Sequence, residues 1–172
     1  MTARRNRRKS VPSRQREHRR HGCWDHLIVA PLWVAYQANL GTLLRTCDAV
    51  GACMAVPKTT HYRQALDKGD TLPLRPHLHW VEGSKVAWIR KQRADGKRIV
   101  VVELNDGAIP LCMLQAASQS TVLVLGHEAA GVPDEIFGMA DDVVQIPMVG
   151  VGMSLNVAVA GSLVAYRLAG LS

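Results

Sequence analysis

Residues 121–128 read TVLVLGHE, and this stretch decides the fold class. Five consecutive apolar or β-branched residues predict a short strand that is buried on both faces, and the glycine after them ends it. A strand with one face in water would alternate apolar and polar residues instead. The stretch is therefore typical of a parallel sheet that is covered by helices on both sides.

Strands and helices of matching character alternate along the rest of the chain. Further strands are expected at residues 27–30, 53–56, 77–81, 98–104 and 143–146. Helices are expected at residues 40–50, 62–68, 84–93, 110–117, 134–139 and 154–168. This alternation predicts an α/β fold whose mainly parallel sheet is flanked by helices.

The composition indicates one globular domain with a basic arm. The chain has 172 residues, of which 48% are hydrophobic and 20% are charged. Nine of the 21 lysines and arginines fall in residues 1–20 beside a single acid, Glu17, so the remainder is close to neutral. Clustered like charges without apolar residues favour disorder. We expect a disordered arm at residues 1–22 and a folded domain at residues 23–172.

The cysteines and the apolar segments argue against several classes of protein. Cys23, Cys47, Cys53 and Cys112 form no C-x-x-C pair and have no histidine at a zinc-ligand spacing, so no metal site is predicted. No apolar run follows the basic start, and the longest one, residues 154–169, is interrupted by Asn156 and Arg167. We therefore expect a cytoplasmic protein without a secretory signal or a membrane span.

Common enzyme motifs are incomplete. His127 and Glu128 begin an H-E-x-x-H motif, but Gly131 stands where the second histidine belongs. The glycine fingerprint of a dinucleotide-dependent oxidoreductase is broken because Leu155 replaces its third glycine. No phosphate-binding P-loop motif is present.

Three segments join strand ends to glycines and polar side chains, at residues 39–51, 123–133 and 146–156. Each has an ordinary structural interpretation when taken alone. Arg45 pairs with Asp48 one helical turn later, Glu128 binds loop amides, and Ser154 caps the last helix. The carboxyl ends of parallel strands are, however, the usual place for a binding site.

Taken together and in order, the three segments resemble one family. They contain the motifs N-x-G-x-x-x-R from Asn39, L-G-x-E-x-x-G from Leu125 and I-P-M-x(5)-S-L-N from Ile146. This pattern is similar to the SpoU/TrmH branch of the SPOUT RNA methyltransferases, and the resemblance covers about residues 25–168. It implies a C-terminal trefoil knot, which periodicity alone does not predict.

The resemblance also implies a reaction, the transfer of a methyl group from S-adenosylmethionine to a ribose 2′-hydroxyl of RNA. The cofactor residues that it implies are Leu125, Gly126, Ile146, Met148, Ser154 and Leu155. The catalytic residues that it implies are Asn39, Arg45, Glu128, Ser154 and Asn156.

The resemblance implies that Arg45 activates the ribose hydroxyl. A free guanidinium has a pKa above about 12, so we expect Arg45 to hold the adjacent phosphate and stabilise the developing alkoxide. Asn39 and Asn156 are expected to orient Arg45 and the loop before the last helix.

The family further implies a homodimer that forms through the last helix. Gly161, Ala165 and Ala169 recur at every fourth position there and provide a flat strip for a second helix, from the partner or from the same chain.

The expected RNA contacts are Arg4, Arg5, Arg7, Arg8, Lys9 and Arg45, with a second candidate helix that carries Lys85, Arg90, Lys91 and Arg93. We expect tRNA as the substrate, with rRNA as the alternative, and a non-catalytic RNA-binding protein as the rival function.

Overall fold

Seven strands in the described part of the chain form one sheet, and every neighbouring pair is parallel. The computed structural model describes residues 27–69, 72, 76–152 and 154–172. The six predicted strands are confirmed to within two residues at each end. In sheet order the strands are β3 (Leu78–Val81), β2 (Cys53–Pro57), β1 (Leu27–Ala30), β6 (Thr121–Leu125), β4 (Arg98–Val102), β7 (Asp142–Gln145) and β5 (Ile109–Pro110).

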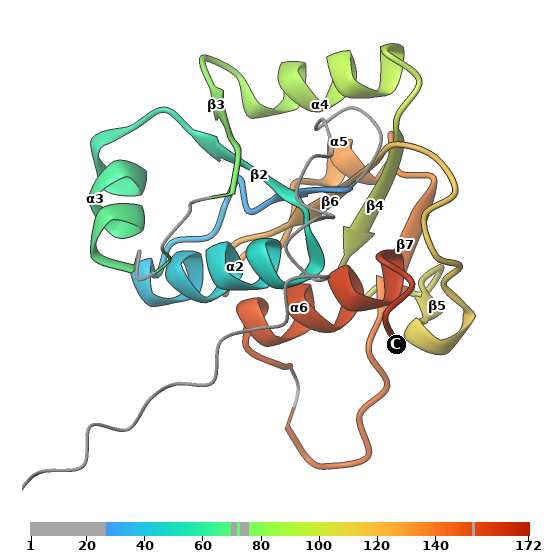
Figure 1. Cartoon of the computed structure of the whole chain (residues 1–172). Helices are drawn as coiled ribbons and strands as arrows, with labels where there is room; N and C mark the ends of the chain where they lie inside the picture. The colour runs from blue at the N-terminus through green and yellow to red at the C-terminus, as the bar shows by residue number, and fades with distance from the viewer. Residues whose placement is uncertain (1–26, 70–71, 73–75, 153) are drawn as a thin grey trace, which may run out of the picture.

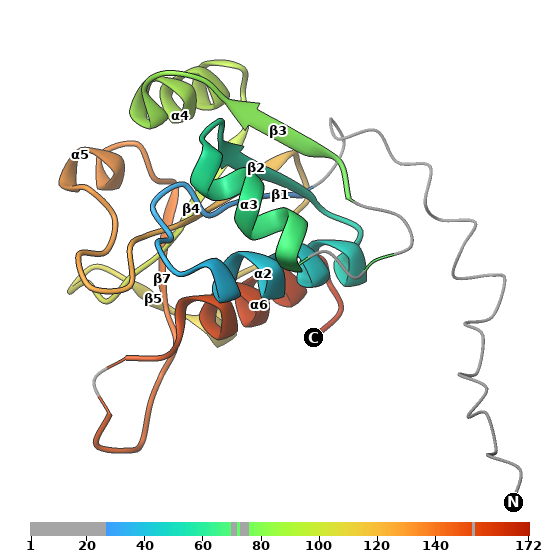
Figure 2. The same cartoon turned by 90° about the vertical axis from the view of Figure 1, so that its left-hand side faces the viewer.

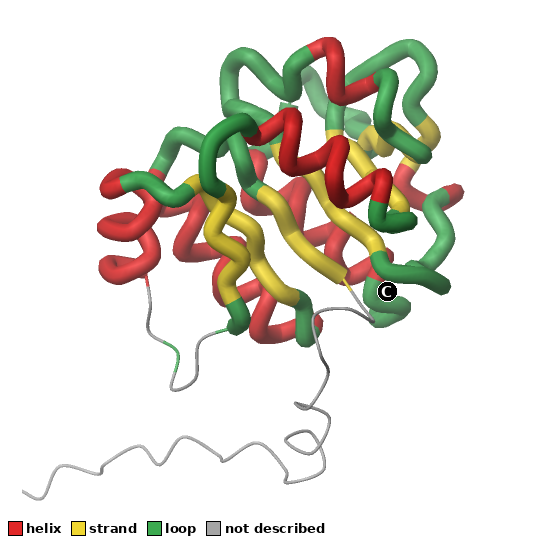
Figure 3. Tube along the Cα trace, turned by 90° about the horizontal axis from the view of Figure 1, so that it is seen from above, coloured by secondary structure: helices red, strands yellow, loops and turns green. Residues whose placement is uncertain are grey.

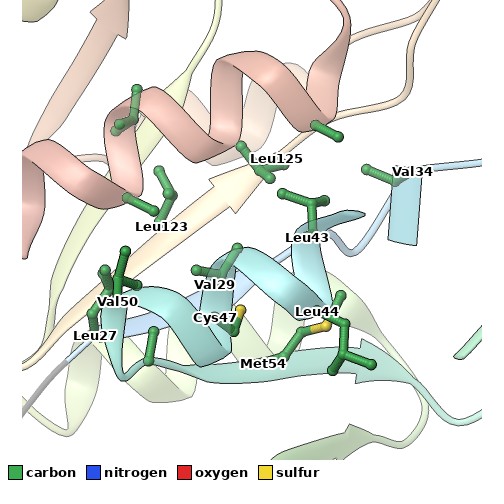
Figure 4. Close-up of a cluster of buried hydrophobic side chains, with 14 of the residues drawn as sticks. Leu27, Val29, Val34, Leu43, Leu44, Cys47, Val50, Met54, Leu123 and Leu125 are labelled. Atoms are coloured by element: carbon green, nitrogen blue, oxygen red, sulfur yellow. The ribbon is translucent and has the colours of Figure 1, made fainter. Parts of the chain in front are cut away.

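Strand β6 lies near the middle of the sheet, and all five of its residues are buried. Its side chains alternate between two apolar cores, because successive residues of a strand point to opposite faces. Leu123 and Leu125 belong to one core, in which they lie close to Val29 and Leu43 (Figure 4). Val122 and Val124 belong to the core on the other face. The apolar run at residues 121–125 thus reflects burial on both sides.

Helices cover both faces of the sheet (Figures 1 and 3). The face of Leu123 is covered by α2 (Gln37–Val50), α3 (Thr60–Gly69) and α6 (Val157–Leu168). The opposite face is covered by α4 (Lys85–Ala94) and the short α5 (Asp134–Phe137). Helix α6 runs beside α2 at the bottom of Figure 1.

Two glycines set the path of α2. Gly51 ends the helix with φ at 72°, a left-handed conformation that glycine adopts without strain. Gly41 faces Gly69 of α3, and a Cβ atom on Gly41 would lie 3.0 Å from the Cα atom of Gly69. The two helices therefore cross closely where they lie side by side in Figure 2.

The predicted helix at residues 110–117 is wrong. The segment contains the end of β5, a single 3₁₀ turn at Leu111–Met113 and irregular backbone. Arg167 of α6 donates hydrogen bonds to the carbonyl oxygens of Cys112 and Leu114, and the amide of Ala117 donates to Leu168. Contacts with the distant α6 therefore satisfy backbone groups that a local helix would have paired.

The small residues of α6 pack inside the chain. Gly161 and Ala165 are buried, and a Cβ atom on Gly161 would lie 2.6 Å from Cδ1 of Leu125 and 3.1 Å from Cδ2 of Leu43. Of the two partners that the sequence left open for this strip, the structure thus supplies the one within the same chain.

None of the helices in the described residues has the length and apolar character that a membrane span requires. The predicted arm at residues 1–22, with Arg4, Arg5, Arg7, Arg8 and Lys9, lies outside the described residues.

Candidate active site

A cavity of about 340 Å³ opens at the carboxyl ends of β4, β6 and β7. This is where parallel sheets usually bind ligands, and the volume falls within the usual range for small-molecule sites. Residues from three strand ends, the start of α2 and the start of α6 surround it. The lining residues are Tyr36, Val102, Glu103, Leu104, Gly126, His127, Glu128, Val144, Gln145, Ile146, Met148, Ser154, Leu155, Asn156, Val157 and Ala160.

Five of the six predicted cofactor residues line this cavity: Gly126, Ile146, Met148, Ser154 and Leu155. Leu125 does not, because its side chain points into the core, where it packs beside Gly161. Segments that are about 20 to 30 residues apart in the chain thus meet at one place, as the sequence predicted for them.

The loop that precedes α6 forms one wall of the cavity. Residues 147–152, 154 and 155 make no hydrogen bond to any of the described residues. The loop extends away from the helices, as Figure 2 shows for the segment between β7 and α6. Its backbone donors and acceptors therefore have no partner within the described chain, and a ligand can bind to them.

Two polar lining residues, Glu128 and Asn156, are joined by hydrogen bonds through Asn39, which is not itself a lining residue, and this hydrogen-bonded chain forms the polar wall of the cavity. Glu128 Oε1 accepts a hydrogen bond from Asn39 Nδ2 at 2.7 Å, and Asn39 Oδ1 accepts one from Asn156 Nδ2 at 3.0 Å. The Glu128 carboxylate also accepts from the amides of Ala35 and Tyr36. The loop after β6, the start of α2 and the start of α6 are joined in this way.

The environment of Glu128 keeps its carboxyl ionised. Burial raises the pKa of Glu128, but the hydrogen bonds from the Ala35 and Tyr36 amides and from Asn39 outweigh this effect, so the net pKa is lowered. An ionised carboxylate with three donors is a strong acceptor and a poor proton donor. Glu128 therefore acts here as a fixed anchor for the loop before α2.

Asn156 caps the final helix in place of the predicted Ser154. Helix α6 begins at Val157, and Asn156 Oδ1 accepts hydrogen bonds from the amides of Ala158 and Val159 at 2.9 and 3.3 Å. The prediction that the helix begins at Ser154 and is capped by it is wrong. Asparagine is as good a cap as serine, and it offers a second polar group to Asn39.

Gly126 is needed for a contact within the chain. The loop after β6 closes through two backbone hydrogen bonds between His127 and Gly131, at 2.8 and 2.9 Å. A Cβ atom on Gly126 would overlap the backbone of Gly131. Gly126, which also lines the cavity, is thus required for the close approach of Gly131 within the chain.

Arg45 lies apart from the cavity lining, exposed on α2. The Arg45 side chain makes no hydrogen bond or salt bridge to another described residue, so it is not paired with Asp48. Asn39 hydrogen-bonds both Glu128 and Asn156, and neither asparagine makes a hydrogen bond to Arg45. Its neighbour Thr46 contacts Ser162 of α6 through a hydrogen bond of 2.7 Å between the two hydroxyls.

Glu103 is the main lining residue that the sequence analysis missed. Its carboxylate accepts hydrogen bonds from the amides of Leu104 and Val132, at 3.1 and 3.2 Å. A signal was present, because Glu103 is the charged residue at the end of the apolar run RIVVVEL. The predicted strand at residues 98–104 includes Glu103, whereas β4 ends at Val102.

An α/β fold with a cavity at the carboxyl ends of parallel strands is the architecture of many nucleotide- and cofactor-binding enzymes. Residues 26–166 match the SpoU rRNA Methylase family, and the chain therefore belongs to this family.

Among curated relatives, the chain is 30% identical over 133 residues to the tRNA (guanosine(18)-2′-O)-methyltransferase of Escherichia coli (strain K12), which covers 75% of this chain and 56% of that protein. It is 32% identical over 136 residues to the 23S rRNA (guanosine(2553)-2′-O)-methyltransferase RlmP of Bacillus subtilis (strain 168), covering 77% and 53%. The chain thus spans about half the length of the curated relatives that it matches.

Among solved structures, the chain is similar to the AdoMet-bound rRNA methyltransferase from Sinorhizobium meliloti. The TM-score is 0.72 at 27% identity, and the match covers 87% of this chain and 58% of that one.

Proposed function

We propose that the protein transfers the methyl group of S-adenosylmethionine to a ribose 2′-hydroxyl of RNA, with tRNA as the favoured substrate. The observation that carries this proposal is the cavity, which is lined both by the loop whose residues 147–152, 154 and 155 make no hydrogen bond to the described chain and by the Glu128–Asn39–Asn156 chain. The E. coli relative, named for tRNA guanosine methylation, supports the choice of tRNA.

The cavity suits a ligand that has both apolar and polar parts. Ile146, Leu155 and Val102 offer apolar surface, and Glu103 offers a carboxylate. The loop contributes backbone groups that recognise the edge of a purine base. In this proposal Gly126, Ile146, Met148, Ser154 and Leu155 hold the cofactor, and the Sinorhizobium meliloti structure, described as AdoMet-bound, supports it. The cofactor supplies a methyl group on a positively charged sulfur.

Arg45 acts on the RNA in this mechanism. Its exposed guanidinium holds the phosphate next to the reacting ribose and stabilises the charge that develops on the 2′-oxygen as the proton leaves to water. Glu128, Asn39 and Asn156 serve as positioning residues. They fix the starts of α2 and α6, and thereby the direction in which α2 presents Arg45.

A homodimer would use the exposed side of α6. Val159, Leu163 and Tyr166 lie on one stripe of this helix, and they are 47%, 43% and 38% exposed. Arg45 is within one helical turn of the contact between Thr46 and Ser162, so it borders the same surface. Light scattering is expected to give the mass of two chains, and of one chain for Leu163→Lys. A wild-type monomer at micromolar concentration would contradict the dimer.

The C-terminal segment is proposed to form the trefoil knot of the family. Residues 103–120 leave β4, cross to β5 at the edge of the sheet and return to β6, while α6 contacts Leu114 and Ala117 within that loop. Pulling on both ends of a single molecule tests the proposal. A knotted chain extends to less than its full contour length, whereas an unknotted chain reaches it.

The basic arm is proposed to bind the RNA backbone through Arg4, Arg5, Arg7, Arg8 and Lys9. The methyltransferase domain is proposed to span residues 23–172, and the protein is proposed to act in the cytoplasm. Deletion of residues 1–20 is expected to weaken RNA binding and to flatten its salt dependence. The affinity for the cofactor stays unchanged. If the deletion left the salt dependence of RNA binding unchanged, the result would contradict the proposal that the arm binds RNA.

One assay tests the reaction. The protein is incubated with methyl-labelled S-adenosylmethionine and total RNA, and the RNA is then digested to nucleosides and nuclease-resistant dinucleotides. Label in a 2′-O-methylated dinucleotide from the tRNA fraction is expected. Label in rRNA alone would favour the reaction for which the B. subtilis relative is named. No label in either would favour a non-catalytic RNA-binding protein.

A further inference from the structure

A cluster of one cysteine and two histidines lies at the other end of the sheet, away from the cavity. Cys53 begins β2, His79 lies in the edge strand β3, and His77 directly precedes β3. One possible ligand atom from each side chain, the cysteine Sγ or a histidine ring nitrogen, lies within 4.8 Å of the others. The cavity is formed at the carboxyl ends of the strands, so the two sites are separate.

Strand pairing brings these three residues together. In the parallel register Ala55 lies opposite His79, and the Met54 amide donates a hydrogen bond of 3.0 Å to the His77 carbonyl, which extends the ladder towards the start of both strands. Because side chains two residues apart in a strand share a face, Cys53 and His77 point to the same side as His79. The cluster is therefore a consequence of backbone register.

One ring nitrogen of the cluster is buried and unpaired within the described chain. Cys53 is 4% exposed, and the Nε2 atom of His79 is buried without a hydrogen-bond partner among the described residues. Buried polar atoms are nearly always paired, so an unpaired ring nitrogen needs an explanation. His77 is exposed, which leaves the cluster open to solvent on one side.

We propose that Cys53, His77 and His79 bind a zinc ion. One thiolate and two imidazoles form a donor set that zinc prefers, and tetrahedral coordination leaves a fourth position for water. On binding, the Cys53 thiol loses its proton to solvent and a sulfur–zinc bond forms. The ion ties the edge strand β3 to β2, which protects an edge that is otherwise paired on one side alone.

The sequence did not predict this site because its ligands are distant in the chain. Cys53 and His77 are 24 positions apart, and no C-x-x-C or H-x-H-x-C pattern joins them. Zinc motifs are recognised by short spacings, whereas this site depends on which strand lies beside β2.

Metal titration of the full chain tests the proposal. After removal of metal with a chelator, the wild type is expected to bind one equivalent of Zn²⁺ by calorimetry. With Co²⁺ it is expected to show a thiolate-to-cobalt charge-transfer band and the visible absorption of tetrahedral cobalt. Zinc also raises the melting temperature, because it binds the folded state.

Variants identify the ligands. His77→Ala and Cys53→Ala are each expected to weaken zinc binding by at least about tenfold. Cys53→Ala is also expected to lose the charge-transfer band, because it lacks the thiolate. The matched controls Cys112→Ser and His61→Ala, both at exposed positions, retain binding within about twofold of the wild type. His77 is exposed, so its variant stays informative even if Cys53→Ala does not fold.

Two results would overturn the proposal: a chelator-treated wild type that takes up no zinc, and His77→Ala that binds zinc as tightly as the wild type. Methyl transfer is measured separately, so a failure of the zinc site leaves the proposed reaction untouched.

Discussion

The two walls of the cavity differ in how firmly the chain holds them. On one side Glu128, Asn39 and Asn156 are linked by hydrogen bonds of 2.7 and 3.0 Å, and backbone amides add further bonds to Glu128. On the other side residues 147–152, 154 and 155 have no hydrogen bond to the described chain. The polar wall is thus organised before any ligand arrives, whereas the loop keeps its backbone groups for the ligand.

The two walls therefore have different roles in the proposed site. A network that joins three segments from distant parts of the sequence fixes the orientation of α2 and hence of Arg45. A loop with uncommitted amides and carbonyls binds a ligand without first breaking internal hydrogen bonds. Substitutions on the two sides are therefore expected to have separable effects on turnover, folding and cofactor affinity.

The largest effect is expected for Arg45→Ala. Arg45 is exposed and does not line the cavity, so in the proposed mechanism its loss removes stabilisation of the reacting RNA and leaves the cavity lining unchanged. Turnover with tRNA falls at least about 100-fold, and the dissociation constant for S-adenosylmethionine stays within about twofold. Single-turnover kinetics and calorimetry measure the two quantities.

The control for Arg45→Ala is Arg63→Ala on α3, which removes an equal charge beside Trp80. It is expected to keep most of the turnover. Full turnover by Arg45→Ala would contradict a role of Arg45 in methyl transfer.

Asn39→Ala is expected to have the next largest effect, because it cuts the polar wall at its centre. Asn39 is 7% exposed, and its loss removes one of the three donors to Glu128 and leaves the Asn156 Nδ2 group without its acceptor. The free energy of unfolding falls by about 1–3 kcal/mol. Urea denaturation measures it, and Asn105→Ala, in an exposed turn, serves as the control. An Asn39 variant as stable as that control would show that the wall contributes nothing.

Two variants of Asn156 distinguish the helix cap from the hydrogen bond to Asn39. Asn156→Ala removes both the cap of α6 and the bond to Asn39, and it is expected to lower the free energy of unfolding by about 1 kcal/mol or more. Asn156→Ser keeps a capping oxygen and loses the donor to Asn39. The difference between the two variants gives the value of the cap. Equal losses in both would mean that the cap is unimportant.

The smallest effect is expected for the pH dependence of Glu128. Its lowered pKa stabilises the folded state above the usual glutamate pKa of about 4.3, and this contribution is lost as the pH falls through the lowered folded-state pKa. Glu128→Gln is therefore less stable than the wild type near neutral pH, and the gap narrows in acid. The urea midpoints of both proteins, measured near neutral pH and in acid, test whether the difference in stability narrows. A gap that widens in acid would contradict the lowered pKa.

The sequence predicted the parts of the fold that depend on local pattern. Apolar runs such as residues 121–125 predicted their strands, since burial on both faces leaves no polar alternation. The segment at residues 110–117 was mispredicted because Arg167, more than 50 positions away, binds its carbonyl groups. No local pattern contains that partner.

The candidate site shows the same limit. The ordered motifs predicted that Gly126, Ile146 and Leu155 belong to one site, and all three line the same cavity, while their binding of the cofactor stays a prediction. The cap at Asn156 and the hydrogen bond from Asn39 to Glu128 depend on how helices and loops meet, which spacing along the chain does not encode. Arg45 remains a prediction, because its proposed partner is the RNA.

Calorimetric titration of the full chain with S-adenosylmethionine tests the central claim most directly. The account predicts one binding site per chain, with affinity that falls for Leu155→Asp in the cavity lining and stays unchanged for Arg45→Ala on α2. A folded wild-type chain that gives no heat of binding at millimolar cofactor would contradict the account.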